Sequence, residues 1–123
     1  MIGYVTLGTN DLPRAAAFYD ALFAGIGGKR VMDYDTLVLW GNGAGKPALG
    51  VIRPHDQKAA TAGNGTMIAI AVENPAQVDA LYKKAIELGA ACEGPAGPRG
   101  QGFYAGYCRD LDGNKLNFYH MGG

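Results

Sequence analysis

The chain carries one pattern twice. Residues 4–19 (YVTLGTNDLPRAAAFY) and residues 67–82 (MIAIAVENPAQVDALY) run in step at a constant offset, 67 − 4 = 63. Each copy opens with an apolar stretch, crosses an Asn-containing corner with a nearby Pro, and continues as an amphipathic pattern with a tyrosine at the same place. This repetition indicates two copies of one structural unit. Because 123 residues fit a single domain, each copy needs the other to complete the fold.

The first copy predicts the element order β-α-β-β-β. Residues 2–8 are apolar and β-branched, as in a strand. From Asp11 onward, apolar residues recur at intervals of three and four, which predicts a helix with one buried face. Asn10 or Asp11 can cap this helix, and Pro13 falls in its first turn. Three short strands are predicted to follow, at residues 29–34, 36–40 and 48–53.

The second copy restarts after a polar connection at residues 55–65, so the predicted modules span residues 1–54 and 66–123 of one domain. A Gly/Pro-rich stretch predicts that the strand around Cys92 is short. An Asp-Gly pair favours a tight turn within DLDGN and therefore a closing hairpin. The predicted elements are a strand at 66–72, a helix at 75–88, the strand around Cys92, and hairpin strands at 103–109 and 115–120.

The alternation of side chains along the strands suggests how the two copies combine. If Val5 and Ile68 pack against the helices, Tyr4 and Met67 point the other way. Two such sheets curving toward each other would enclose a cup. The sequence therefore predicts an α+β fold of two βαβββ modules, whose curved mixed sheet encloses this cup.

Composition argues against several function classes. Eleven basic and eleven acidic residues give a net charge of zero, without the basic surplus that nucleic-acid binding needs. No apolar run is long enough to span a bilayer, and the start MIGYVTLGTN does not resemble a signal peptide, so we expect no membrane partner and a cytoplasmic location. Cys92 and Cys108 are then expected to stay reduced. The sequence contains no serine, which excludes serine hydrolases.

Three stretches of the chain resemble the vicinal oxygen chelate superfamily, also called the glyoxalase, bleomycin-resistance and dioxygenase superfamily. They are YVTLGTNDLPRAAAFYDALF, AGNGTMIAIAVENPAQVDALY and FYAGYCRDLDGNKLNFY, and together they cover nearly the whole chain. The last is the most specific, because many members end on a DPDGNxxE motif. The resemblance implies paired βαβββ modules and a homodimer.

The metal-ligand places of the superfamily carry unusual residues in this chain. Metal-using members place a His in the first strand, a second His in the matching strand of the second module, and a Glu in the last strand. Carried over by motif, these places hold Tyr4, Met67 and Asn117. A neutral phenol, a thioether and an amide are poor ligands for a divalent cation. The resemblance therefore implies a member without a metal, and we expect no cofactor.

The closing hairpin suggests where a ligand would lie. Pairing around the turn predicts that Gly106 lies opposite Asn117 and Tyr104 opposite Tyr119. In that register Tyr104, Asn117 and Tyr119 share a face with a bare spot at Gly106. A ligand there would stack on the phenols and hydrogen-bond the amide. The alternative is that the tyrosines belong to the core or to a dimer interface.

The other candidate binding residues each have a structural alternative. Tyr4 and Met67 either line a pocket or fill it. Trp40, the only tryptophan, either binds a ligand or packs in the core. Arg53 would meet an anionic ligand, or it is solvated or ion-paired. We assign no catalytic residue.

The expected function is binding of a small organic molecule in the cavity between the modules, without a metal, as in the bleomycin-resistance proteins. The predicted ligand-binding residues are Tyr4, Met67, Tyr104, Asn117, Tyr119, Trp40 and Arg53. One alternative is a lyase or isomerase similar to lactoylglutathione lyase. A second is a structural module with a filled cavity. The identity of the ligand stays open.

Overall fold

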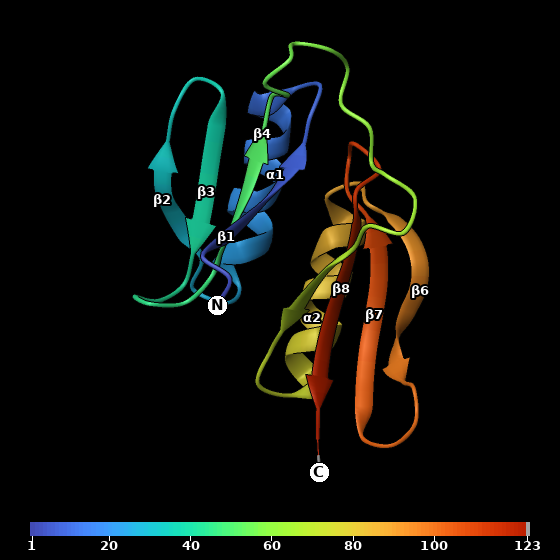
Figure 1. Ribbon diagram of the computed structural model, residues 1–123. Helices are drawn as coiled ribbons and strands as arrows, with labels where there is room; N and C mark the ends of the chain where they lie inside the picture. Colours follow the sequence, from blue (N-terminus) through green and yellow to red (C-terminus); the bar gives the residue numbers. More distant parts are fainter. Residues whose placement is uncertain (123) are drawn as a thin grey trace. The chain divides into compact units, whose positions relative to one another are not determined.

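The computed structural model describes residues 1–122 (Figure 1). The chain divides into two compact units, unit 1 (Met1–Ala62) and unit 2 (Gly63–Gly123). Unit 1 contains β1 (Tyr4–Gly8), α1 (Leu12–Ala24), β2 (Lys29–Asp33), β3 (Leu37–Gly41) and β4 (Ala48–Ile52). Unit 2 contains β5 (Ile68–Ala71), α2 (Pro75–Glu87), β6 (Ala91–Pro98), β7 (Phe103–Arg109) and β8 (Lys115–Met121).

The two units have the same topology. Unit 1 forms a four-stranded sheet in the order β1-β4-β3-β2, and unit 2 forms one in the order β5-β8-β7-β6. The first strand of each sheet runs parallel to the last strand of its unit, and all other pairs are antiparallel. The predicted α+β fold class of two βαβββ modules is therefore confirmed.

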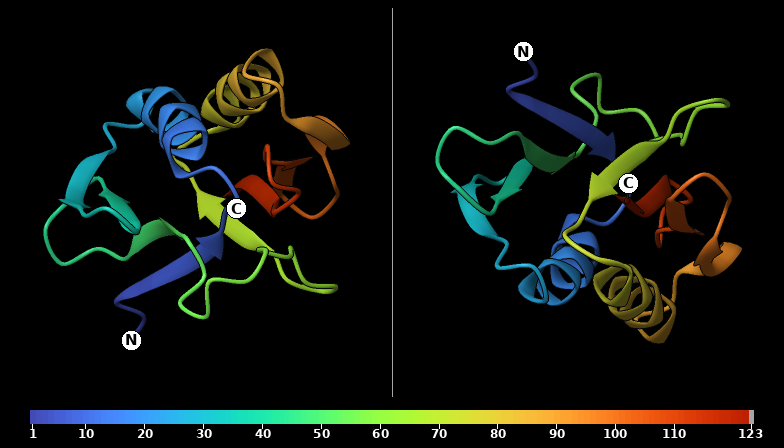
Figure 2. Two further views of the ribbon diagram at one scale, coloured as in Figure 1. Left: turned by 90° about the horizontal axis from the view of Figure 1, so that it is seen from above. Right: turned by 90° about the horizontal axis from the view of Figure 1, so that it is seen from below.

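The first helix begins after Asp11, one of its two predicted caps, and each helix covers one face of the sheet of its own unit (Figure 2). The Asp11 carboxylate accepts a 3.1 Å bond from the Arg14 N–H, and Asn74 caps α2 through a 2.9 Å bond from the Gln77 N–H. These caps satisfy N–H groups that the helix leaves unpaired. The apolar residues that α1 and α2 bury are Leu12, Ala15, Ala16, Phe18, Tyr19, Leu22 and Phe23, and Val78, Leu81 and Ala85.

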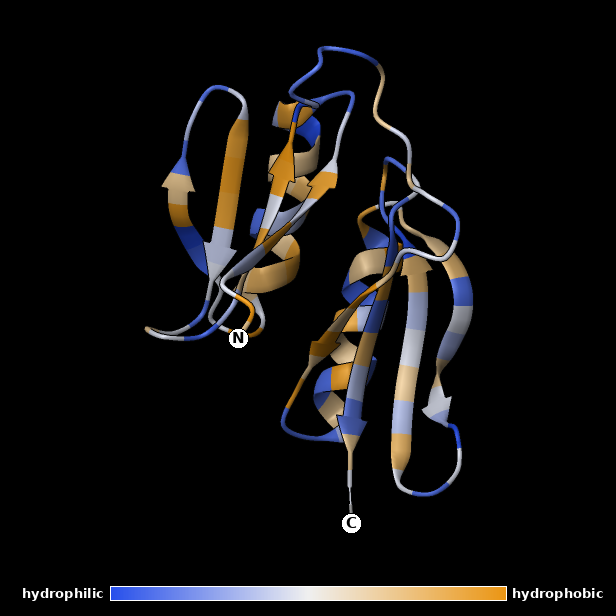
Figure 3. Ribbon diagram, viewed as in Figure 1, coloured by the Kyte–Doolittle hydropathy of each residue, from blue (hydrophilic) through white to orange (hydrophobic). Residues whose placement is uncertain are grey.

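Apolar residues predominate in β3 and β4 of unit 1, as the colours of Figure 3 show. Three consecutive residues of each strand are buried, and Val51 is only 1% exposed. Burial of this apolar surface is the main source of stability in such a small unit. Among the described residues, no helix combines the length and the apolar character needed to cross a bilayer.

The hairpin of β7 and β8 departs from the predicted register by one residue. Gly106 lies opposite Phe118, Tyr104 lies opposite His120, and Asn117 is paired with Tyr107. A slip of one residue turns a side chain to the other face of the sheet. The prediction that Tyr104 shares a face with Asn117 is therefore wrong.

The turn explains this slip. The Asp110 N–H donates a 2.8 Å bond to the Asn114 carbonyl, which leaves a three-residue loop that ends at Gly113 with φ 86°. The Asp110 carboxylate also accepts 2.9 Å bonds from the N–H groups of Asp112 and Asn114. A side chain that bonds the loop backbone in this way sets the loop length, and the loop length sets the register.

Strand β6 also departs from prediction. It extends over eight residues, whereas a short strand was predicted around Cys92. Its pairing with β7 shifts twice, between Cys92 and Gly94 and between Gly94 and Gly97. Such bulges let a strand continue through glycines that would otherwise weaken the pairing.

Candidate functional site

In each unit one sheet face is covered by the helix and the other is helix-free. A Cβ atom placed on Gly106 would lie 3.2 Å from the Tyr82 ring of α2, so the even-numbered residues of β7 face the helix. The helix-free face of β7 and β8 therefore carries Phe103, Ala105, Tyr107, Arg109, Lys115, Asn117, Tyr119 and Met121. In Figure 1, α2 lies behind β7 and β8.

Asn117 is the central polar residue of this face and is 2% exposed. Its Nδ2 group donates a 3.1 Å bond to the Gly106 carbonyl and a longer contact of 3.4 Å to the Phe118 carbonyl. Both neighbours are acceptors, so the position requires a donor. A carboxylate would instead bring a buried negative charge against two carbonyl oxygens, which is costly.

Aromatic rings flank Asn117 along the strands. Tyr119 lies two residues farther along β8, and its ring centroid is 5.6 Å from that of Phe103 at an angle of 34°. Tyr107 lies directly across from Asn117 on β7. This combination of phenol rings and an amide suits a ligand with an aromatic body and a polar group.

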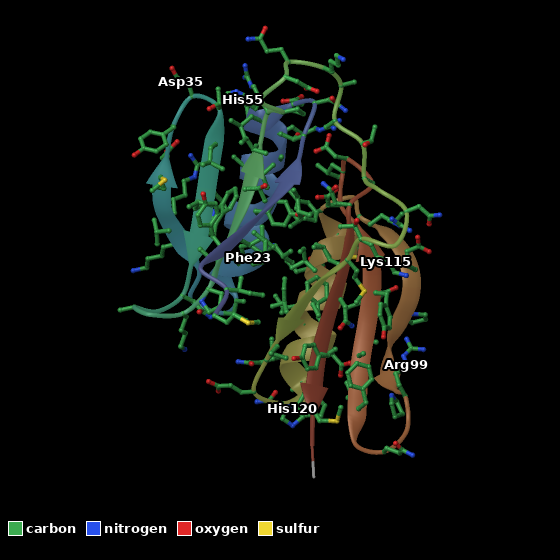
Figure 4. The ribbon with its side chains drawn as sticks, in the orientation of Figure 1. Phe23, Asp35, His55, Arg99, Lys115 and His120 are labelled. Atoms are coloured by element: carbon green, nitrogen blue, oxygen red, sulfur yellow. The ribbon has the colours of Figure 1, made fainter. Side chains whose placement is uncertain are left out.

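Two cationic side chains lie against the Tyr107 ring. The Arg99 Cζ atom is 5.5 Å and the Lys115 Nζ atom 5.6 Å from the ring centroid. Both distances are within the range of a cation–π interaction. Figure 4 labels both residues, Lys115 at the start of β8 and Arg99 in the connection after β6.

Met67 lies at the start of the neighbouring strand and is 40% exposed. Ala69 pairs with Asn117, so Met67, two residues earlier, belongs to the same helix-free face by strand alternation. Three of the predicted site residues, Met67, Asn117 and Tyr119, thus share one face of unit 2.

Tyr4 lies on the helix-free face of unit 1, where it is 59% exposed. Next to it, Thr6, Gly50 and Leu39 pair across β1, β4 and β3. The Leu39 side chain occupies the space that a Cβ atom of Gly50 would need. The glycine therefore lets a leucine cover the sheet at this point.

Trp40 lies on the helix side of unit 1 and is 2% exposed. Its ring centroid is 5.5 Å from that of Tyr19, and its Nε1–H donates a 2.9 Å bond to the Asp20 carboxylate. Asp20 also accepts a 2.7 Å bond from Arg30, which lowers the pKa of this carboxyl. These contacts account for Trp40 as a packing residue of the core.

Tyr104 and Arg53 complete the predicted set. The Tyr104 hydroxyl donates a 2.7 Å bond to Asp79 of α2, a bond that raises the pKa of the phenol. Arg53 is exposed just after β4, and its backbone N–H bonds the Thr36 carbonyl at 2.9 Å. Tyr104 thus faces a helix, away from Asn117.

Sequence reasoning missed Tyr107, Phe103, Arg99 and Lys115. Two of these, Tyr107 and Phe103, were detectable in principle, because alternation along FYAGYCR places them on one face. Their relation to Asn117 depends on the register of the hairpin. The position of Arg99 depends on the bulges of β6, for which the sequence gives no clear signal.

The residues at the superfamily's ligand places do not fit a divalent metal. They are a phenol, a thioether, and an amide whose nitrogen points at carbonyl oxygens. Within either unit, the described residues contain no cluster of three or more His, Cys, Asp or Glu side chains suited to a cation. Imidazole and carboxylate ligands would be needed for such a cation.

Comparison with known proteins decides the family. The model of the Glyoxalase/Bleomycin resistance protein/Dioxygenase superfamily matches residues 1–118. The chain belongs to this superfamily. A comparison with curated proteins finds no match.

Solved structures resemble the chain over nearly its whole length. A glyoxalase/bleomycin resistance protein from Albidiferax ferrireducens T118 is 34% identical, with a TM-score of 0.87 and 98% of each chain covered. The hypothetical protein SA1046 from S. aureus is 28% identical, with a TM-score of 0.75, and 98% of this chain and 92% of that chain are covered.

A lactoylglutathione lyase from Agrobacterium tumefaciens is 22% identical, with a TM-score of 0.71, and 98% of this chain and 92% of that chain are covered. At this identity the likeness establishes the shared fold alone.

Proposed function

We propose that this superfamily member binds a small organic molecule on the helix-free faces of its sheets, without a metal. The observation that carries the proposal is the role of Asn117. At the place where metal-using members have a Glu, this chain has an amide that donates to the Gly106 carbonyl. Two tyrosines of the same face, Tyr107 and Tyr119, flank it.

The side chains at the ligand places argue against metal-dependent chemistry. Isomerisation through an enediolate and activation of dioxygen both rely on a bound cation as Lewis acid or as the site of oxygen binding. Asn117 cannot supply the charge of the missing Glu, and Tyr4 and Met67 cannot supply the imidazoles. A surface of aromatic rings around a neutral amide instead favours reversible binding of an organic ligand.

A thermal-shift experiment tests the proposal. The protein is titrated with a panel of aromatic compounds and, separately, with Zn²⁺, Ni²⁺, Mn²⁺ and Fe²⁺. We expect stabilisation by at least one class of organic compound and none by the cations, since bound ligand stabilises the folded state by mass action. Stoichiometric stabilisation by a cation would overturn the metal-free proposal in favour of a glyoxalase-like lyase or isomerase.

Two tyrosines of the same hairpin provide a matched control. Tyr119 lies on the helix-free face, whereas Tyr104 faces α2. Tyr119→Ala should weaken binding of the stabilising compound about tenfold or more, because stacking on an aromatic ring is lost. Tyr104→Ala should leave its affinity unchanged. Equal effects of the two substitutions would place the ligand elsewhere.

The family resemblance also supports a homodimer, which we propose as the state in solution. Large apolar side chains are exposed on unit 1, including Tyr4 and Val31, which are 59% and 61% exposed. A second copy that covered these side chains would remove apolar surface from water. Light scattering should give twice the chain mass of 12.9 kDa. A mass of one chain would contradict the dimer and leave the binding proposal intact.

A further inference from the structure

The helix-free face of unit 2 carries a local excess of positive charge. The whole chain has a net charge of zero. On this face, however, Arg99, Arg109 and Lys115 accompany Glu93, the one carboxylate within the described strands β6, β7 and β8. Electrostatic asymmetry of this kind attracts ligands of the opposite sign.

Glu93 is already paired. The Arg109 Nε–H donates to the Glu93 carboxylate, and Arg109 Nη1 donates a 3.1 Å bond to the Gly113 carbonyl at the hairpin turn. This ion pair lowers the pKa of the Glu93 carboxyl. Arg109 and Glu93 therefore brace the turn and neutralise each other.

Arg99 and Lys115 are left without a carboxylate at hydrogen-bond distance among residues 1–122. Arg99 has one protein partner there, the Pro95 carbonyl, which accepts a bond from Nη2. A guanidinium has five N–H donors, so most of its hydrogen-bonding capacity is available to a ligand. Lys115 has a Coulombic contact with Glu93, which already pairs with Arg109.

The two cations contact the same ring. Both lie within 6 Å of the Tyr107 ring centroid, so the distance between them is at most the sum of those two distances. The guanidinium geometry suits a carboxylate or a phosphate, and the ammonium adds a second charge. Tyr119 and Phe103 on the same face supply stacking surface.

We infer that the ligand is an aromatic organic anion whose carboxylate or phosphate binds Arg99 and Lys115, with its ring against the aromatic side chains beside Asn117. This inference rests on the proposed function and specifies its ligand class. The anion would satisfy the open donors of Arg99.

Isothermal titration calorimetry with three matched probes tests the inference. The probes are 2-naphthoate, its neutral amide 2-naphthamide, and 2-naphthyl phosphate. At low ionic strength we expect at least one anion to bind about tenfold more tightly than the amide, because a charge-assisted bond is added. The stronger of the two anions identifies the acidic group. The preference should shrink at high salt.

Matched variants locate the charge effect. Arg99→Gln and Lys115→Gln should each reduce the affinity for the preferred anion about tenfold and leave the affinity for 2-naphthamide unchanged. Lys83→Gln removes the same charge from an exposed position on α2, across the same sheet, and should change neither affinity.

The outcomes separate this inference from the proposed function. Equal binding of the amide and the anions, or equal loss in all three variants, overturns the anion inference while small-molecule binding stands. The same holds if none of the three probes binds but a neutral or cationic compound stabilises the protein in the thermal-shift panel. If no organic compound stabilises the protein, both fail.

Discussion

The two units share a backbone plan but place their polar chemistry on opposite sides of the sheet. The helices Leu12–Ala24 and Pro75–Glu87 are related by the same offset of 63 residues as the sequence repeat, and the strand orders correspond. In unit 1, the charged network of Asp20, Arg30 and Trp40 lies on the helix side. In unit 2, Asn117 and the cationic groups of Arg99, Arg109 and Lys115 lie on the helix-free side. The two copies therefore share the same strand pairing, whereas the side chains on each face of the two sheets differ.

The contrast can be followed in equivalent rows, which are sets of residues that pair across neighbouring strands of each sheet. On the helix-free face, Thr6, Gly50 and Leu39 of unit 1 correspond to Ala69, Asn117 and Tyr107 of unit 2. The first row is closed by a leucine that lies over a glycine, whereas the second presents an amide and a phenol. On this face unit 1 thus has a leucine over a glycine, and unit 2 has the hydrogen-bonding and aromatic groups on which the proposed function rests.

The two units also differ in the side chains that fill the space between the helix and the sheet. Tyr19 and Tyr82 occupy equivalent positions of α1 and α2. Tyr19 is fully buried and packs on Trp40, whereas Tyr82 lies against Gly106, the counterpart of Val38. A large residue on the strand in one unit is replaced by a glycine in the other, which keeps room for the helix tyrosine.

The largest expected effect comes from the helix-side row that pairs Arg30 with Trp40 in unit 1 and Cys92 with Cys108 in unit 2. Trp40→Ala should lower the free energy of unfolding by about 3–5 kcal/mol, because it empties the aromatic cluster. Cys108→Ala, at the equivalent position, should cost only about 1 kcal/mol. Urea denaturation followed by far-UV circular dichroism measures both.

Trp40→Phe is the control for this comparison. It keeps a ring against Tyr19 but removes the N–H that bonds Asp20, so its loss should lie between those of the other two variants. Equal losses for Trp40→Ala and Cys108→Ala would show that the two units do not differ in core packing as described.

The next effect concerns the helix-free rows. Asn117→Asp should lower the free energy of unfolding by about 1–3 kcal/mol at pH 7, because it removes a buried donor and adds a charge near the Gly106 carbonyl. Asn117→Ala removes the bond without adding charge and should cost less. Urea denaturation at pH 7 and pH 4 measures the difference.

The pH dependence has a definite sign. Burial raises the pKa of a carboxyl, and the protonated form can donate to the carbonyl as the amide does. The penalty of Asn117→Asp relative to the native chain should therefore shrink as the pH falls. A penalty that stays constant or grows toward acid pH would contradict the donor role of Asn117.

Local sequence patterns predicted the helices and strands. They did not predict which side chains of the β7–β8 hairpin lie on each face, because that depends on the length of the turn. Spacing of apolar residues identified both helices within two residues, and Asp11 was one of two predicted caps of the first helix. The placement of Tyr104 failed because the Asp110 carboxylate holds a loop whose length is not set by the Asp-Gly pair alone. A difference of one residue in the length of that loop changes which side chains lie on the same face as Asn117.

The sequence likewise could not predict on which face of the sheet Trp40 lies. Its strand is apolar on both sides, so alternation gives no direction. Its hydrogen bond to Asp20 spans twenty residues and forms only when helix and sheet pack together. The sequence pattern could name Trp40 as a candidate but could not place it.

A smaller effect is expected from the ion pair of unit 1. The bond from Arg30 lowers the pKa of Asp20 below its ordinary value of 3.8. The carboxylate therefore stabilises the fold above that pH, and the contribution is lost as the pH falls through the lowered pKa. The side chains are 44% and 35% exposed, so Asp20→Asn should cost no more than about 1 kcal/mol at pH 7.

Lys83 is the control for this substitution, because it is the equivalent of Asp20 in unit 2. Lys83→Gln should leave the free energy of unfolding within about 0.5 kcal/mol of the native value, as is usual for exposed surface positions. Urea denaturation at pH 7 and at pH 2.5 measures both variants. If the Asp20→Asn deficit does not shrink as the pH falls below 3.8, the ion pair is not its cause.

The smallest effect involves reactivity alone, and it concerns Cys92 and Cys108 of unit 2. Burial, with a further contribution from the Asp110 charge, raises the pKa of the Cys108 thiol to about 12, whereas Cys92 is exposed. Iodoacetamide at pH 8 should therefore label Cys92 and spare Cys108, because the thiolate is the reactive form. Peptide mass spectrometry of the labelled protein distinguishes the two sites, and full denaturation should expose both. Labelling of Cys108 in the native protein would mean that the helix side of unit 2 opens locally. The positions that Trp40 and the Asp20–Arg30 ion pair fill in unit 1 would then be loosely packed in unit 2, the unit that carries the proposed ligand-binding face.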